Sequence, residues 1–316
     1  MARFSLTSIF WASVALLVPA ARASPLNLPP AATEGMKLMY AGQPDRAQEL
    51  FRKVQADRPE YPLGYLLEAE ALWWKLYCSS LEWKFNTLDA WSHARAPEDD
   101  TYLALADKAA RLANSAIAKS DSAEMELYAG MGYLLRARLL GLRFEKSPTA
   151  HAGVEARKHL LRCLELDPDM ADAYTGLGLY NYYVDTLSSF AKILRFFMGI
   201  PGGSKRDGLR QLETAMAEGE LTPVEARFYT AKNLRNYDRE YAHAAEVAAP
   251  LLREYPQNPL FRLLAADIAE KLGHNEAAVS GFRAAAAAPE GDPGCAARLA
   301  QVVREGLTAL GTGPKN

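Results

Sequence analysis

The side chains that most often carry catalysis or bind metals are scattered along this 316-residue chain. Its five histidines form no HExxH motif, and no cysteine pair has the spacing of a zinc site. His151 and His159 lie two helical turns apart, too far to share a metal without a third ligand. The glycine-rich stretch before Ser204 lacks the spacing of a phosphate-binding loop, so we expect Ser204 to be an ordinary helix N-cap. We therefore predict no catalytic residue, no metal, no cofactor and no enzymatic activity.

Two pairs of carboxylates are candidates for an acid and a base. They are Glu68 with Glu70 and Glu124 with Glu126. A spacing of two residues points the members of each pair to different sides of a helix, so neither pair forms a couple by local geometry. We expect these residues on a solvated face or at a helix start.

Aromatic residues are concentrated in two places. Four of the five tryptophans fall between Trp73 and Trp91, and tyrosine and phenylalanine crowd the segment from Tyr174 to Phe197. Aromatic side chains usually fill cores, which is the simpler expectation. Tryptophan and tyrosine also anchor interfaces, so the alternative is a groove that grips a peptide or a glycan. For that alternative the predicted partner-binding residues are Trp73, Tyr77, Tyr174, Asn181, Tyr182 and Asp185.

The segment 187–200 (LSSFAKILRFFMGI) is predominantly apolar, with Lys192 and Arg195 on one flank. A helix of this kind could lie on a membrane surface. Two basic residues are few for such attachment, so we expect an inserted helix that packs against its neighbours.

The N-terminus has the features of a signal peptide. Arg3 precedes the apolar run Ile9–Val18, and Ala21-Arg22-Ala23 matches the cleavage pattern of a signal peptidase. The run is too short to span a bilayer, which needs about 20 residues. We therefore predict that residues 1–23 are removed and that the protein is exported, either to the periplasm or out of the cell.

Charge and composition narrow the class further. Loss of Arg3 and Arg22 leaves 34 basic and 38 acidic residues, with no basic stripe, which argues against nucleic-acid binding. Alanine and leucine abound and no alternating strand of convincing length occurs, which predicts an all-α fold. The three cysteines allow at most one disulfide, and we expect them buried as small apolar side chains.

One spacing recurs along the chain: a small residue, a large apolar residue four positions later, and another apolar or small residue three positions after that. Offsets of four and three place all three on one helical face, where the small residue lets a neighbouring helix approach closely. Proline follows in three copies and ends the helix. The copies begin at Ala47, Ala156, Gly208, Ala244 and Ala278.

These copies resemble the tetratricopeptide repeat (TPR) family, whose unit of about 34 residues is a pair of helices. Gly35-x2-Leu38 and Tyr174-x2-Leu177-Gly178-x2-Asn181 are similar to the signature of the first helix of that unit. A more specific resemblance covers about 174–260. Within it, the segment 180–219 resembles an extended repeat of bacterial exported TPR proteins and, distantly, a eukaryotic TPR family of lipid-droplet and inclusion-body clearance. The resemblance implies a helix-pair solenoid and no particular activity.

The predicted organisation is a signal peptide (1–23), a flexible lead (24–33), a TPR-like array (34–288) and a capping helix with a tail (289–316). From Ala47 to Ala156 we expect about three units with degenerate middle copies. The predicted function is a protein-interaction scaffold that binds a protein or peptide on its concave face. The alternatives are a helical enzyme acting on cell-wall polymer and a membrane-surface protein docked through 187–200.

Cleavage after Ala23 can be tested directly. We expect Ser24 at the N-terminus of the exported protein, because the Ala21-x-Ala23 site follows a short apolar run. Intact-mass measurement of the protein from its native compartment checks this. A chain that still carries Met1 or Ala2 there would contradict the prediction.

Overall fold

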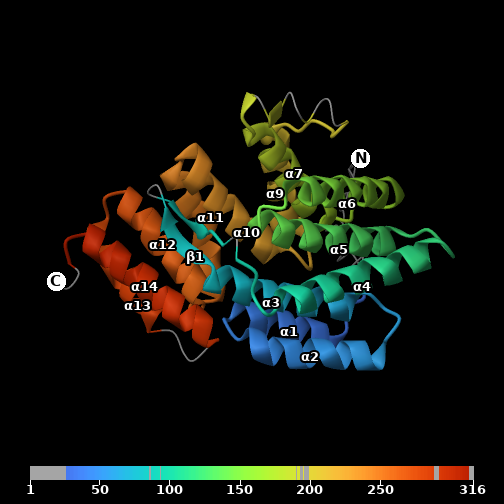
Figure 1. The fold of residues 1–316 in the computed structure, drawn as a ribbon, viewed down its shortest axis with the longest axis horizontal. Coiled ribbons are helices and arrows are strands. Elements are labelled where there is room, and N and C mark those ends of the chain that lie inside the picture. Colours follow the sequence, from blue (N-terminus) through green and yellow to red (C-terminus); the bar gives the residue numbers. More distant parts are fainter. Residues whose placement is uncertain are drawn as a thin grey trace, which may run out of the picture.

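The computed structural model describes residues 26–84, 87–92, 94–189, 191–192, 195, 199–287 and 292–312. This part of the chain is all-helical, as predicted, except for one short hairpin (Figure 1). The elements in chain order are α1 (Pro30–Tyr40), α2 (Pro44–Asp57), α3 (Leu63–Ser79), β1 (Leu81–Lys84), β2 (Thr87–Ala90), α4 (Asp99–Ile117), α5 (Ala123–Leu142), α6 (Lys146–Leu166), α7 (Ala173–Thr186), α9 (Lys205–Glu218), α10 (Pro223–Asn233), α11 (Tyr241–Glu254), α12 (Pro259–Lys271), α13 (Asn275–Ala286) and α14 (Pro293–Ala309). A π-helical turn, Leu234–Asp238, extends α10.

Consecutive helices pack in pairs: α1 with α2, α3 with α4, α5 with α6, α7 with α9, α10 with α11, and α12 with α13. Small residues set the distance within a pair. A Cβ atom on Gly178 of α7 would lie 2.8 Å from the carbonyl oxygen of Gly208 on α9, so only glycine permits this crossing. The residues that begin the five repeat copies are buried, all on the second helix of a pair. The architecture is therefore TPR-like.

The prediction of three units between Ala47 and Ala156 is wrong, because two steps along the array connect them. Ala47 lies on α2 and Ala156 on α6, and α4 is the one second helix between them. Its repeat positions are Ala106, Ala110 and Ala113, all of them alanine, so no large residue marks this copy in the sequence. The extra length comes from the hairpin insertion and from long helices, of which α6 has 21 residues.

The hairpin β1–β2 has no counterpart in the prediction. Its antiparallel strands have four residues each, and Trp83 faces Leu88 across the ladder. Strands this short give little alternating signal in the sequence. Packing explains their stability, because the Trp83 indole donates to the carbonyl of Val302 (2.9 Å) and contacts the Phe282 ring edge-on.

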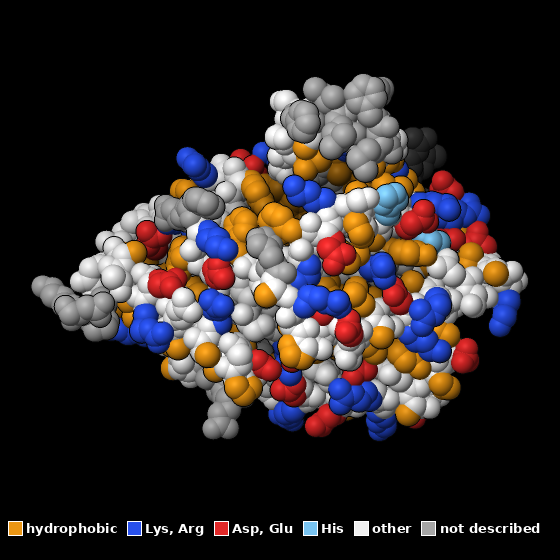
Figure 2. Space-filling view, viewed as in Figure 1, with side chains coloured by type: hydrophobic (Ala, Val, Ile, Leu, Met, Phe, Trp, Pro, Cys, Tyr) orange, Lys and Arg blue, Asp and Glu red, His pale blue; other side chains and the backbone are white. Residues whose placement is uncertain are grey.

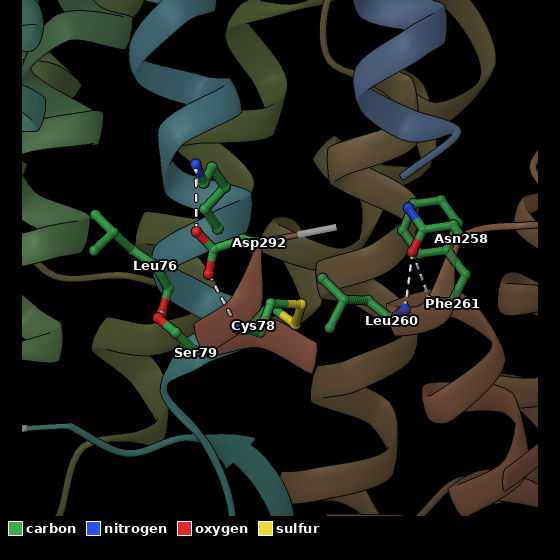
Figure 3. Close-up of a disulfide and its surroundings, with 9 residues drawn as sticks. Leu76, Cys78, Ser79, Asn258, Leu260, Phe261 and Asp292 are labelled. Carbon is green, nitrogen blue, oxygen red and sulfur yellow. Dashed lines mark hydrogen bonds and ion pairs between the residues drawn. A yellow bond between two sulfur atoms is a disulfide. The ribbon is translucent and has the colours of Figure 1, made fainter. Parts of the chain in front are cut away.

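The array curls until its last helix meets its second pair. α14 packs on α13 and also on α3, which lies centrally in Figure 1 between the N-terminal and the C-terminal pairs. A disulfide between Cys78 and Cys295 joins α3 to α14 (Figure 3). Lys75 and Asp292 form an ion pair beside it (3.4 Å). Our expectation of three reduced, buried cysteines thus holds only for Cys163, because a sequence separation of 217 residues hid the contact.

Removal of this bridge should loosen the closed end of the array. Replacing Cys78 and Cys295 by alanine should lower the free energy of unfolding by about 2–4 kcal/mol, because the unfolded chain regains the freedom of a long loop. Denaturant unfolding measures the change. Reductant should destabilise the parent and leave the double variant unaffected.

The number of thiols supplies an independent check. We expect one titratable thiol per unfolded chain before reduction and three after it. Three thiols without any reductant would contradict the bridge.

Candidate functional site: an apolar groove inside the array

A groove of about 880 Å³ opens on the inner side of the array. The first helices of four consecutive pairs, α3, α5, α7 and α10, supply most of its wall. Strand β2, the start of α6 and described residues of the segment 187–200 supply most of the rest. Most of the wall residues are apolar or aromatic. Ligand-binding pockets typically measure about 300–1,000 Å³ and share this composition, so the groove is the candidate functional site.

Helical periodicity explains why each wall helix contributes several residues. On α3, Glu70, Trp73 and Tyr77 recur at spacings of three and four and so share one face. On α10, the same rule brings Glu225 and Lys232 to the groove. Each stripe mixes aromatic rings with one or two charged groups.

An ion triad crosses the groove wall. The Arg138 guanidinium on α5 donates to the Glu70 carboxylate on α3 (2.7 Å) and to the Glu225 carboxylate on α10. Its charge also lies over two rings, 5.1 Å from the centre of Trp73 and 5.5 Å from that of Tyr229. The Trp73 indole donates to the Tyr229 hydroxyl (2.8 Å), which fixes the two rings relative to each other. The triad therefore joins three wall helices by charge and aromatic contact.

Two buried carboxylates share one guanidinium in the triad, and the pKa of one of them, Glu225, is shifted. Burial raises the pKa of Glu225 from 4.5 to about 8, and the charge of Glu70 adds to this, although Arg138 opposes it. At neutral pH a proton on Glu225 leaves the triad without net charge. The wall is then compatible with an apolar guest.

A second ion pair fixes the hairpin to the groove. Lys232 of α10 donates to both carboxylate oxygens of Asp89 on β2 (2.9 and 3.0 Å), and the Tyr77 hydroxyl donates to the same carboxylate (3.1 Å). Burial alone would lower the pKa of Lys232, but Asp89 and the neighbouring Tyr183, Tyr77 and Tyr237 together outweigh it and raise that pKa well above its ordinary value.

Asp172, just before α7, anchors the loop that enters α10. It accepts hydrogen bonds from the backbone N–H groups of Glu220, Leu221 and Thr222 (2.8–3.1 Å) and from the Thr222 hydroxyl (2.9 Å). These donors compensate the burial of its charge. The start of α10 is therefore held against α7 at the groove.

The lip of the groove exposes apolar side chains. Among the described residues, four large hydrophobic side chains are exposed, and three of them line the groove: Phe144 (53%), Leu187 (40%) and Tyr237 (52%). On the face shown in Figure 2, hydrophobic side chains gather where α7 and α10 lie in Figure 1. Exposed apolar surface around an apolar groove is typical of an interaction site.

Two of the six predicted partner-binding residues line this groove. Trp73 and Tyr77 are largely buried and present only a small part of their rings to it. Trp91 from the same tryptophan-rich stretch also contributes, whereas Trp83 packs under α14. The structure thus divides the first aromatic group between groove and core.

The other four predicted residues lie on α7 but outside the groove. Tyr182 is fully buried and donates to Asp238 (2.9 Å), and Tyr174 packs against a small apolar cluster formed by α9 and α10. Asn181 donates to Gln211 of α9 (2.8 Å), while Asp185 pairs with Lys192 (3.0 Å). This face of α7 therefore packs against α9, the turn after α10 and Lys192.

The opposite face of α7 supplies groove residues that were not among the six predicted partner-binding residues, although Tyr180 and Tyr183 belong to the second aromatic group. Thr175, Leu179, Tyr180 and Tyr183 recur there at helical spacing. A count of residues three and four positions apart would have separated the two faces. It would not have shown which face meets α9.

Of the four glutamates expected on a solvated face or at a helix start, Glu124 and Glu126 do lie in the first turn of α5, but Glu68, Glu70 and Glu126 are buried. Glu68 accepts from Arg52 and Gln55 (2.6 Å each), and Glu126 pairs with His159 (2.6 Å). Their partners lie on the neighbouring helices α2 and α6, so burial is compensated by ion pairs that no local pattern encodes. The N-cap prediction is confirmed, since the Ser204 hydroxyl accepts from the backbone N–H of Asp207.

Two absences concern the described part of the chain. Its His, Cys, Asp and Glu residues form no group of three that could hold a metal ion. No described helix combines the length and apolarity needed to cross a membrane. Of the segment 187–200, the phenylalanines at 190, 196 and 197 lie outside the described residues, whereas Leu187, Arg195 and Ile200 line the groove.

No protein-family model matches the chain, and no curated protein matches its sequence. Three solved structures have a similar arrangement of helices. The thermophilic TPR protein TTC0263 of Thermus thermophilus is 14% identical, with 86% of this chain and 97% of that chain covered and a TM-score of 0.33. Yeast Tom70 is 12% identical (88% and 88% covered, TM-score 0.30), and the TPR domain of P58(IPK) is 14% identical (88% and 98% covered, TM-score 0.25). Sequence identities and TM-scores this low carry no information on what this protein binds.

The proton on Glu225 gives the fold a pH dependence. The folded chain holds this proton up to about pH 8, whereas an unfolded glutamate loses it near 4.5, so stability falls as the pH rises between these values. Replacing Glu225 by glutamine should remove this contribution. We expect the melting temperature of the parent to fall more than that of the variant between about pH 6.5 and pH 8.

Two details sharpen this comparison. Asp267, whose pKa is raised to about 6 mainly by burial, contributes mostly below the chosen window. Glu218→Gln, an exposed change on α9, is the matched control and should keep the parent's pH dependence. Equal slopes in the parent and in Glu225→Gln would contradict the assignment.

Proposed function

We propose that this protein is an exported protein-interaction scaffold that holds an apolar segment of a partner protein in the groove of its helical array. The observation that carries the proposal is the groove itself, about 880 Å³ in volume, together with its lip of exposed Phe144, Leu187 and Tyr237. Stacked helix pairs create extended concave surfaces of this kind and commonly bind through them.

Ion pairs fix the helices of the groove wall relative to one another. Arg138 ties α3, α5 and α10 together, and Lys232 ties α10 to the hairpin. A preformed site loses less conformational entropy on binding than one that must first be ordered. The ion pairs thus favour recognition of a guest by shape.

The same contacts argue against the enzymatic alternative. Catalysis on a cell-wall polymer would need two carboxylates that converge from distant helices, and Glu70 and Glu225 do converge. Both are bound to the guanidinium between them and both are buried. Acid–base catalysis requires direct reach to the substrate, which this arrangement restricts.

Two observations bear on the cellular compartment of the protein and on its attachment to a membrane. Disulfides persist in oxidising compartments, so the bridge between Cys78 and Cys295 supports export. Leu187, Arg195 and Ile200 face the groove, which favours a role of the segment 187–200 at the binding site over attachment to a membrane surface.

Site-specific crosslinking tests the proposal. A photoreactive benzoyl-phenylalanine placed at Leu187, on the lip, should crosslink to a partner in the cells that produce the protein. The same group at Lys158, an exposed position on α6 outside the groove, is the matched control and should give no such product.

Blocking the groove supplies the second arm. Ala137 lines the groove on α5, so Ala137→Trp should fill part of the volume and abolish the crosslink from Leu187. Circular dichroism and melting would confirm that this variant is folded. Crosslinks that persist in it, or that are equal from Lys158, would contradict partner binding in the groove.

A further inference from the structure

Acidic and basic residues of the groove wall differ in whether they have partners of opposite charge or hydrogen-bond donors. All four acidic wall residues have partners: Glu70 and Glu225 bind Arg138, Asp89 binds Lys232, and Asp172 accepts hydrogen bonds from the loop before α10. Two basic wall residues remain, Lys146 and Arg195. Neither has an acidic partner among the described residues.

Arg195 has hydrogen-bond donors that the described residues do not use. One of its terminal nitrogens donates to the carbonyl oxygen of Ile200 (3.0 Å), while its Nε is buried and has no partner among the described residues. A guanidinium offers five N–H donors, so this side chain retains capacity for an anion. Carboxylates match the planar geometry of that group well.

A stripe on α6 extends the basic region. Lys146, Ala150, Gly153 and Arg157 follow at spacings of four, three and four, which places them on one helical face. The two small residues leave room between the two basic ones, since a Cβ atom on Gly153 would meet only the Tyr180 ring, at 3.9 Å. The Arg157 guanidinium lies over that ring, 5.7 Å from its centre.

Tyr180 joins this stripe to Arg195. Its ring lines the groove, and the charges of Arg157 and Arg195 both oppose the rise in its pKa that burial causes. Arg157 and Arg195 therefore both lie near the Tyr180 ring, and Lys146 lines the groove at the start of the same face of α6; we name the surface beside these three residues the basic end.

We infer that the partner segment in the groove is acidic as well as apolar, with its apolar side chains against α3, α5 and α7 and its carboxylates at the basic end. This inference rests on the function proposed above and specifies the chemistry of the partner. Complementary charge would compensate the basic groups that have no acidic partner among the described residues, and it would fix the direction of the bound segment.

The distribution of the charges favours a peptide over a single-chain lipid. The basic groups come from two separate elements, and apolar lip residues lie on different elements too, from Phe144 after α5 to Tyr237 after α10. An extended peptide can present several side chains at such spaced positions, whereas a fatty acid offers one charged group. We therefore commit to an internal peptide segment.

A displayed library of random peptides provides the test. It is panned on the parent, on the groove-filled variant Ala137→Trp and on the charge-reversed variant Lys146→Glu/Arg195→Glu. The control variant, Lys158→Glu/Arg206→Glu, has the same change in net charge at exposed positions outside the groove. Peptides are displayed by their C-terminal ends, so that a free terminal carboxylate is not selected.

The expected result is enrichment of peptides in which aspartate or glutamate lies next to leucine, phenylalanine or tyrosine. Synthetic copies should bind the parent and the control variant equally, and should bind the charge-reversed variant about tenfold more weakly or less still. They should not bind the groove-filled variant. The melting temperature of each variant is measured so that lost binding is not confused with lost folding.

The failures are distinguishable. Apolar peptides without an acidic preference, bound equally by the charge-reversed variant, would overturn the inference and leave the proposed function standing. Peptides that bind the groove-filled variant as well as the parent would overturn both. If no peptide is enriched and calorimetry shows that sodium hexadecanoate binds the parent but not the groove-filled variant, the guest is an anionic lipid and the peptide assignment is wrong.

Discussion

The guanidinium of Arg138 is the constraint on which the site depends. A buried charge is costly unless it is paired, and losing one partner of a buried pair costs about 3–5 kcal/mol. Arg138 meets this condition only while Glu70 on α3 and Glu225 on α10 remain within reach. The relative placement of three helices is thereby fixed by one side chain.

This constraint also explains why an apolar groove persists instead of collapsing. Apolar surface favours closure, and a simple helical array could approach until its inner leucines met. Closure would displace the carboxylates from Arg138 and the rings of Trp73 and Tyr229 from its two sides. The groove is thus held open by polar contacts in its wall, and a partner's apolar segment can supply the burial that the protein forgoes.

The sequence predicts what local periodicity and prolines encode, and it misses what depends on distant pairing. The helix starting positions follow from turns and caps such as Ser204, and the small residues at Ala47, Ala244 and Ala278 mark the second helices of pairs. Nothing near Glu70 in the chain indicates Arg138 or Glu225, 68 and 155 residues away. The disulfide to Cys295 escapes prediction for the same reason.

Helix α7 shows how a repeat separates packing from recognition. The positions of α7 that match the TPR signature, Tyr174, Gly178 and Asn181, face α9 and take part in the close packing of the two helices. The residues offset from them by one position, such as Thr175 and Tyr180, reach the groove. A signature that identifies the fold must therefore lie on the packing face, because the crossing distance restricts it. The groove face is free of that restriction, so the residues that line the groove are ones that the repeat pattern does not mark.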